Sequence, residues 1–231
     1  MTAKELAGIT AVSYVRSGMV VGLGTGSTAK YFIDALGAAI RDGKLKDIRG
    51  IPTSVHSAQQ AASVGIPLTS FAEFPTVDLT VDGADEVGPG LNLIKGRGGA
   101  LLREKIVAQN SRRLVIIADQ SKKVAVLGSH LPLPVEVAQF SHEAAAHFLT
   151  SLGCKARLRQ ADAGGPFVTD NGNFIYDCTF ARITDPAGVE ETLCHRAGIV
   201  ETGLFISMAD TALIATDDAV ETLTRDWQGL K

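Results

Sequence analysis

The sequence predicts a mixed α/β protein in which a parallel sheet with helices on both faces is joined to a smaller α+β domain. In the first part of the chain, short apolar runs alternate with helical segments, an order typical of parallel strands connected by right-handed crossovers. Beyond residue 131 the order becomes strand, helix, two strands, helix and strand, which is the order of a split β-α-β motif. The 231 residues, 45% of them hydrophobic, suffice for one large domain with a smaller companion.

The first part of the chain opens with a helix and continues with four strands. Residues 19–23 are apolar and run into glycines, as a buried parallel strand does before a turn. By the same reasoning, the expected strands are residues 19–23, 48–53, 77–81 and 113–118. The expected helices are residues 5–16, 28–40, 57–64 and 103–110. All four strands are expected to lie parallel in one sheet.

The second part of the chain contains a hairpin signal. Asn171-Gly172 stands between residues 167–169 and 174–176 and predicts two strands joined by a two-residue loop. The other expected strands are residues 133–137, 155–159 and 200–205. The expected helices are residues 141–152 and 189–196.

The tail, residues 209–227, has an apolar run at 212–215 and a final helix that is expected to return to the first sheet. The expected domains are therefore residues 1–130 together with 206–231, and residues 131–205.

Charge and composition exclude several classes of protein. The formal charge of -3 argues against a general nucleic-acid surface, which needs a concentrated basic face, but not against an anionic small molecule. The three cysteines, Cys154, Cys178 and Cys194, form no C-x-x-C spacing, so no disulfide framework or zinc knuckle is expected. The first residues show no signal-peptide order and no apolar run of membrane length. We expect a cytoplasmic protein without a membrane partner, or a plastid one if a transit peptide is removed from a longer precursor.

A glycine-rich segment, GLGTGST at residues 22–28, lies between a predicted strand and a predicted helix. Glycines let the backbone approach an anion, and a helix start presents free N–H groups to it. The segment matches neither the dinucleotide nor the nucleoside-triphosphate signature, so a single phosphate group is the expected ligand. The residues expected to contact it are Thr25, Gly26, Ser27 and Thr28. The alternative is a tight turn in which Ser27 or Thr28 caps the helix.

An acidic segment, DGADE at residues 82–86, follows the predicted strand 77–81. Ligands of open α/β sheets bind at the carboxyl ends of strands, so these carboxylates are placed to bind hydroxyls or move protons. Two alternatives stay open. The segment can be a solvated acidic turn, or it can hold a magnesium ion, although no distant carboxylate or histidine partner is evident.

A third segment, KGRGGALLREK at residues 95–105, places Lys95 beside glycines and ahead of a helix. A cation next to successive backbone N–H groups suits an oxyanion such as an enediolate. Glu104, early in that helix, is a candidate base, and its alternative role is an ordinary interaction with the helix dipole.

Lys122 follows the strand 113–118 and is a candidate phosphate partner or a solvated lysine. The five histidines show no metal-ligand spacing, and no nucleophilic serine or cysteine motif is present.

The segments GLGTGSTA, DLTVDGADEV, KGRGGALLREK and ADQSKKV, in this order, resemble the ribose-5-phosphate isomerase A family. The resemblance extends over essentially the whole chain and includes LPLPVEV, VTDNGN and ETGLF. It implies a Rossmann-like parallel α/β domain with an inserted ferredoxin-like domain, a homodimer or homotetramer, no cofactor and no metal. It also implies a sugar phosphate as the small-molecule substrate.

The resemblance also implies a role for each motif residue. Glu104 resembles the base that moves a proton between C2 and C1, and Asp82 and Asp85 resemble the pair that positions sugar hydroxyls and assists ring opening. Lys95 resembles the residue that stabilises negative charge on the reacting oxygens. The implied substrate-binding residues are Thr25, Gly26, Ser27, Thr28, Asp82, Gly83, Ala84, Asp85, Lys95, Gly96, Arg97, Gly98 and Lys122. Many members of the family have glycine where this chain has Arg97, so Arg97 has to avoid a backbone angle that only glycine tolerates.

Aldose and ketose phosphates interconvert either by a metal-assisted hydride shift or by proton transfer through an enediolate. The lack of a metal-ligand pattern in the sequence favours the second route. Two rival classes are weighed against it. A sugar-phosphate sensor would need a DNA-reading helix pair, which does not precede Met19. A relative of acyl-CoA transferases would leave the two aspartates of DGAD without a task.

Overall fold

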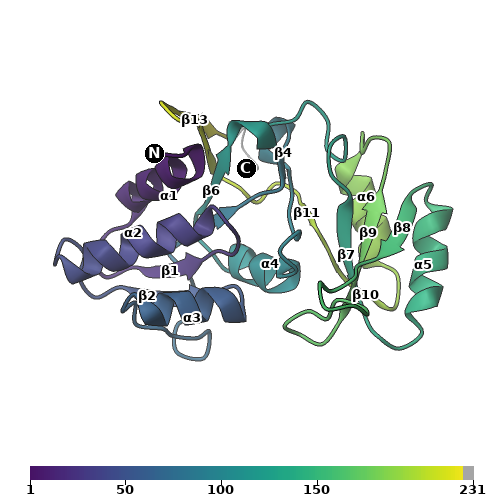
Figure 1. Cartoon of the computed structure of the whole chain (residues 1–231), viewed down its shortest axis with the longest axis horizontal. Coiled ribbons are helices and arrows are strands. Elements are labelled where there is room, and N and C mark those ends of the chain that lie inside the picture. Colours follow the sequence, from purple (N-terminus) through teal and green to yellow (C-terminus); the bar gives the residue numbers. More distant parts are fainter. Residues whose placement is uncertain (226–231) are drawn as a thin grey trace, which may run out of the picture. The chain divides into compact units, whose positions relative to one another are not determined.

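The computed structural model describes residues 1–225, and the chain divides into two compact units. The first unit comprises Met1–Ala84, Arg103–Lys123 and the described part of Ser207–Lys231. The second unit comprises Asp85–Leu102 and Val124–Ile206. Figure 1 shows the course of the chain through the elements of both units.

A six-stranded sheet, ordered β13-β12-β6-β3-β1-β2, forms the centre of the first unit. The five strands from β12 to β2 pair in parallel, and β13 pairs antiparallel with β12 at one edge. The strands are β1 Val20–Leu23, β2 Arg49–Pro52, β3 Leu79–Gly83, β6 Leu114–Asp119, β12 Thr211–Ala215 and β13 Val220–Thr224. The predicted parallel sheet is confirmed.

Helices cover both faces of this sheet. Val20 and Val21 are neighbours on β1 and point to opposite faces, as successive residues of a strand do. Val21 packs in a cluster with Phe32 of α2, and Val20 packs in another cluster with Val107 of α4. The helices are α1 Ala3–Ala11, α2 Ala29–Arg41, α3 Val55–Ser63 and α4 Leu101–Gln109, with short 3-10 turns η1 Val12–Tyr14 and η3 Gln120–Lys122.

The second unit contains a four-stranded antiparallel sheet ordered β10-β7-β9-β8. Its elements follow the chain order β7 Leu133–Val137, α5 His142–Ser151, β8 Lys155–Leu158, β9 Phe174–Thr179, α6 Pro186–Cys194 and β10 Ile199–Thr202. This is the β-α-β-β-α-β order that the sequence predicts, with the last strand placed beside the first. The ferredoxin-like arrangement is confirmed.

A three-stranded sheet ordered β11-β5-β4 also belongs to the second unit. Its strands are β4 Glu86–Val87, β5 Leu93–Ile94 and β11 Leu204–Phe205, with η2 Pro89–Leu91 between β4 and β5. Because β5 pairs with β11, residues 85–102 group with the unit that contains residues 124–206. The compact unit is therefore larger than the predicted domain 131–205, and its boundaries depend on pairing between distant segments.

Three local predictions need correction. Residues 200–205 are not one strand, because Gly203 separates β10 from β11, which pair in different sheets. Residues 167–169 form no strand: the turn at Asn171-Gly172 is present, with a φ of 78° at Gly172, but β9 pairs with β7 and β8 instead.

The predicted final helix is wrong for residues 220–224, which form β13, and for Arg225, which is not helical; residues 226 and 227 of that prediction lie outside the described residues. The sequence Val-Glu-Thr-Leu-Thr alternates and carries β-branched residues, which suits an edge strand that completes the hydrogen bonding of β12. None of the helices formed by residues 1–225 has the length and apolar character needed to cross a membrane.

Candidate active site

The carboxyl ends of β1 and β3 meet at Gly24, Thr25 and Asp82. The Thr25 N–H donates to Asp82 Oδ1 at 3.0 Å, and the Gly24 N–H donates to the Val81 carbonyl at 3.0 Å. A side chain at Gly24 would collide with Asp82, since a Cβ built there lies 2.6 Å from the Asp82 Cα. Glycine at this position therefore allows the loop after β1 to contact the end of β3, and two of the predicted site residues are brought together.

The end of β2 adds two hydroxyl groups that the sequence reading missed. The Thr25 hydroxyl lies 2.7 Å from the Thr53 hydroxyl and donates to Ser54 Oγ at 2.8 Å. Thr53 Oγ1 also donates to the Leu23 carbonyl at 2.9 Å. The signal that could have found them is their position at the carboxyl end of the predicted strand 48–53, just before the helix that Ser54 caps.

The loop that enters α2 presents Gly26, Ser27 and Thr28. Gly26 and Ser27 are exposed, Thr28 is buried, and the Gly26 φ of 108° is one that side chains rarely adopt. Thr28 is the N-cap residue of α2, as the capping alternative expected, but its side chain makes no capping hydrogen bond to the helix. Lys4 Nζ donates to Ser27 Oγ at 3.0 Å and adds a cation that was not predicted. A helix start with exposed glycine, a hydroxyl and a nearby lysine suits an anionic group.

The acidic segment 82–86 divides into different environments. Asp82 is 1% exposed, and its Oδ1 accepts hydrogen bonds from Thr25 and from Gly83, the latter at 2.7 Å. Asp85, in the second unit, is half-buried and accepts from the Arg97 N–H at 2.8 Å. The solvated-turn alternative is wrong for Asp82, because its carboxylate is buried and hydrogen-bonded.

Glu86 is fully buried and has a structural role. Its carboxylate accepts hydrogen bonds from the N–H groups of Gly128, His130 and Leu131 at 2.7 to 2.9 Å. These bonds fix the segment that leads into β7. Among residues 1–225 there is no group of three His, Cys, Asp or Glu side chains arranged to hold a metal ion.

Lys95 follows β5 and is almost completely buried. Its N–H donates to the Gly203 carbonyl at 2.8 Å, and its Nζ lies 5.4 Å from the centre of the Phe205 ring. A Cβ at Gly203 would approach Pro134 to 3.0 Å and would also meet the Lys95 carbonyl, so ETGLF needs its glycine for this close approach.

Residues 96–99 form a turn closed by a hydrogen bond from the Gly99 N–H to the Gly96 carbonyl at 3.0 Å. The positive φ angles fall on Gly96, at 105°, and on Gly99, at 81°. Arg97 is not among the non-glycine residues with a positive φ. Arginine therefore fits at this position, where many family members have glycine, without backbone strain. Gly98 and Arg97 are exposed.

Glu104 lies in the first turn of α4 and is 4% exposed. A glutamate that only interacts with the helix dipole is ordinarily exposed to solvent. The burial of Glu104 instead suits a base that is kept away from water. Glu104 and Asp82 belong to the first unit, whereas Lys95 and Asp85 belong to the second.

Lys122 ends the turn η3 after β6 and is half-buried. Its neighbour Lys123 instead forms an exposed ion pair with Glu221, with 2.9 Å between Nζ and Oε2. Of the two lysines, Lys122 is therefore the candidate for ligand contact.

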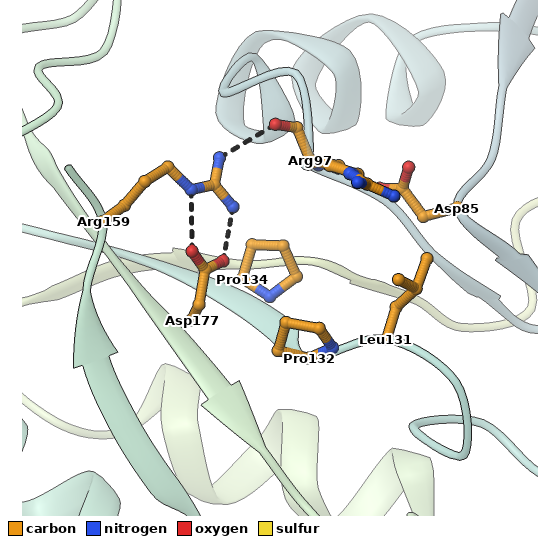
Figure 2. Close-up of a pocket in the computed structure, with 7 residues that line it drawn as sticks. All are labelled: Asp85, Arg97, Leu131, Pro132, Pro134, Arg159 and Asp177. Atoms are coloured by element: carbon orange, nitrogen blue, oxygen red, sulfur yellow. Dashed lines mark hydrogen bonds and ion pairs between the residues drawn. The ribbon is translucent and has the colours of Figure 1, made fainter. Parts of the chain in front are cut away.

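Figure 2 shows a pocket of about 320 Å³ in the second unit. It is lined by Asp85, Arg97, Leu131, Pro132, Pro134, Arg159 and Asp177. Arg159 and Asp177 were not predicted. No local sequence signal marks them, because the contacts of Arg159 with the glycine turn and with Asp177 form only through the fold. Leu131, Pro132 and Pro134 belong to the LPLPVEV segment that carried the resemblance.

Comparisons with known proteins give one consistent result. Residues 49–219 match the family model described as ribose 5-phosphate isomerase A (phosphoriboisomerase A). "Ribose-5-phosphate isomerase A" of Synechococcus sp. (strain JA-3-3Ab) is 50% identical over 221 residues, covering 95% of this chain and 96% of the relative. "Probable ribose-5-phosphate isomerase 2" of Arabidopsis thaliana is 48% identical, covering 94% of this chain and 84% of the relative.

Solved structures agree with these relatives. Ribose 5-phosphate isomerase from Plasmodium falciparum superposes with a TM-score of 0.94 at 39% identity, covering 97% of this chain and 99% of that one. A D-ribose-5-phosphate isomerase in complex with phospho-erythronic acid superposes with a TM-score of 0.94 at 41% identity, covering 96% and 98% of the two chains. With a family model over most of its length and relatives near half identity along nearly all of it, this chain belongs to the ribose 5-phosphate isomerase A family.

Proposed function

We propose that this protein interconverts D-ribose 5-phosphate and D-ribulose 5-phosphate, an aldose-ketose isomerisation of the non-oxidative pentose phosphate pathway. Family membership along nearly the whole chain carries the proposal. The buried carboxylates Asp82 and Glu104 support it, because a proton-transfer enzyme needs carboxylates held away from bulk water.

In this proposal Glu104 is the general base. It removes the proton from C2 of the open-chain aldose while the C1 carbonyl oxygen takes up a proton, and an enediol or enediolate forms. Return of the proton to C1, with loss of the proton from the C2 hydroxyl, gives the ketose. A positioned general base contributes roughly 10² to 10⁴ in rate.

The remaining acceleration is assigned to charge stabilisation and binding. Lys95 and the backbone of the 96–99 turn stabilise the negative charge that develops on the oxygens at C1 and C2. Asp82 and Asp85 position the sugar hydroxyls and assist ring opening. The phosphate is assigned to the loop Thr25–Thr28, and Lys122 is an additional substrate contact.

Assembly and location are part of the proposal. We expect a homodimer or homotetramer in the cytoplasm, with a plastid location if a transit peptide is removed, and no nucleic-acid or membrane partner. No cofactor or metal is required by the proposed chemistry. Sedimentation equilibrium of the purified protein tests the oligomeric state, and a monomer at micromolar concentration would contradict it.

The function is tested by measuring conversion of ribose 5-phosphate to ribulose 5-phosphate in excess EDTA, for wild type and for Glu104→Gln. The substitution keeps the shape of the side chain and removes its basicity. We expect kcat to fall by about 10² to 10⁴ with the fold intact. Glu143→Gln is the matched control, because Glu143 also lies in the first turn of a helix, α5, but is exposed.

Each outcome has a distinct meaning. Wild-type turnover in EDTA that collapses only in Glu104→Gln supports the enediolate route and the base together. Activity that EDTA abolishes refutes the metal-free route. A wild type that binds the sugar phosphate without converting it is a sensor and not an isomerase.

A further inference from the structure

Arg159 connects the second unit's antiparallel sheet to the glycine turn at residues 96–99. It directly follows β8, and its Nη1 donates to the Gly96 carbonyl at 2.9 Å and to the Arg97 carbonyl at 3.1 Å. Figure 2 shows the guanidinium between the carboxylate of Asp177 and the backbone carbonyl of Arg97. No sequence motif and no part of the proposed function uses this residue.

Asp177 holds the guanidinium in place. Its carboxylate accepts from Arg159 Nε at 3.0 Å and also from Nη2, so the pair forms a two-bond fork. The side chain of Arg159 is 13% exposed and that of Asp177 is 26% exposed. A partly buried, two-bond arginine–carboxylate pair holds both side chains in a defined geometry. The Nη1 atom is left to serve the two carbonyl groups of the turn.

Because each peptide unit is planar, a hydrogen bond to its carbonyl oxygen also fixes the direction of its N–H group. In a trans peptide the carbonyl oxygen and the following N–H point in opposite directions, and there is no cis peptide bond in the described chain. Arg159 binds the Gly96 carbonyl, and the N–H on the other edge of that peptide, that of Arg97, donates to Asp85. The peptide between Gly96 and Arg97 is thus held on both edges.

The next peptide is held on one edge only. Arg159 binds the Arg97 carbonyl, which directs the Gly98 N–H away from the guanidinium. Gly98 is exposed, and no group within residues 1–225 accepts a hydrogen bond from its N–H. An exposed N–H of fixed direction, two residues after Gly96 in sequence, is a preorganised donor for an oxyanion.

We propose that Arg159, fixed by Asp177, is a positioning residue that orients the Gly98 N–H toward the negative charge formed during isomerisation. The inference rests on the proposed function, since it assigns a task in that reaction. A second contact supports the same role: the Phe167 ring lies where a side chain at Gly99 would be, and Phe167 donates its N–H to the Arg159 carbonyl at 2.9 Å. The residues around Arg159 therefore fix both ends of the turn.

The test compares Arg159→Gln, Asp177→Asn and the control Arg157→Gln with wild type. Arg157 is an exposed arginine on β8, two residues before Arg159. Because loss of one oxyanion donor reduces kcat by about 10² to 10³, a misdirected donor is expected to reduce it by roughly 10- to 100-fold. The KM for ribose 5-phosphate is expected to change less than about threefold, since a donor to the developing charge acts on the transition state.

A second readout separates positioning from general damage to the fold. Phospho-erythronic acid carries a planar carboxylate at the end opposite its phosphate, so it resembles the enediolate in its pair of oxygens. Its affinity is expected to fall in Arg159→Gln in parallel with kcat, while the affinity for inorganic phosphate stays unchanged. Asp177→Asn is expected to show the same pattern to a smaller extent and serves if Arg159→Gln does not fold.

Two results would overturn the inference. One is a folded Arg159→Gln, or a folded Asp177→Asn if only that variant folds, with a kcat within about twofold of an active wild type. The other is a loss of the same size in Arg157→Gln. An inactive wild type overturns the proposed function itself, and the inference with it, so the two failures are distinguishable.

Discussion

Asp82 uses one carboxylate oxygen, Oδ1, to accept two backbone hydrogen bonds, one from the loop after β1 and one from Gly83. Burying a carboxylate is costly unless hydrogen bonds replace its water. These bonds fix the carboxyl group at the carboxyl end of β3, and the absence of a side chain at Gly24 leaves space for it. A proposed hydroxyl-binding residue is thus placed by its neighbours before any substrate arrives.

Gly24→Ala tests this arrangement. The added methyl group would lie about as close to Asp82 as the Cβ built there, 2.6 Å from its Cα, so the carboxylate or the loop has to move. We expect kcat/KM to fall by about 10² because displacement of a site group by roughly 1 Å has that effect. The measurement is steady-state kinetics with ribose 5-phosphate.

Gly65→Ala is the control for this substitution. Gly65 has a φ of 81° and open space around it, so alanine there strains the backbone without touching Asp82. It is expected to lower stability and leave kcat/KM unchanged. Equal kinetics for Gly24→Ala and wild type would show that the contact with Asp82 does not matter.

Strand β4 illustrates how a short element fixes a distant segment. It contributes Glu86, whose buried carboxylate accepts three N–H groups from residues 128–131. That segment leads into β7 and includes Leu131 of the pocket. A carboxylate in an acidic motif therefore stabilises the fold, whereas the two aspartates before it are assigned to substrate.

Glu86→Gln is expected to lower the free energy of unfolding by about 1 to 3 kcal/mol, since an amide NH₂ would face an N–H donor and leave it unsatisfied. Urea unfolding followed by circular dichroism measures the change. The exposed Glu73→Gln is the control and is expected to change stability by less than about 0.5 kcal/mol. An unfolding midpoint equal to that of wild type would contradict the structural role of Glu86.

At the scale of the whole molecule, a chain of net charge -3 is assigned an anionic substrate. The attraction must then be local, and the candidates are the start of α2, Lys4, Lys95 and Lys122. Binding of this kind favours the folded state, because the ligand binds the folded chain and not the unfolded one.

Ribose 5-phosphate at about 100 times its dissociation constant should therefore stabilise the protein by about 2.7 kcal/mol. For a chain of this size the corresponding rise in Tm is roughly 5 to 10 °C. Thermal unfolding with and without ligand measures the shift, and unphosphorylated ribose at the same concentration is the control. A shift of the same size with ribose would show that the phosphate is not recognised.

The sequence alone predicted the features that depend on neighbouring residues. The strands β1, β3 and β6 were visible as apolar runs ending in glycines or acids, and the positive φ angles fall on Gly96 and Gly99 of the predicted anion-binding turn, not on Arg97. The β-α-β-β-α-β order followed from the same local alternation. These signals are short in range, so backbone sterics and side-chain periodicity suffice to read them.

Tertiary structure decided which distant segments meet. The division between β10 and β11, the edge strand β13, the hydroxyls of Thr53 and Ser54, and the structural role of Glu86 all depend on pairing across the fold. Arg159 lies 63 residues from the Gly96 carbonyl that it binds. No local pattern encodes such a contact, because it forms only when sheet register and loop closure have placed both partners, and that register is a property of the whole packed chain.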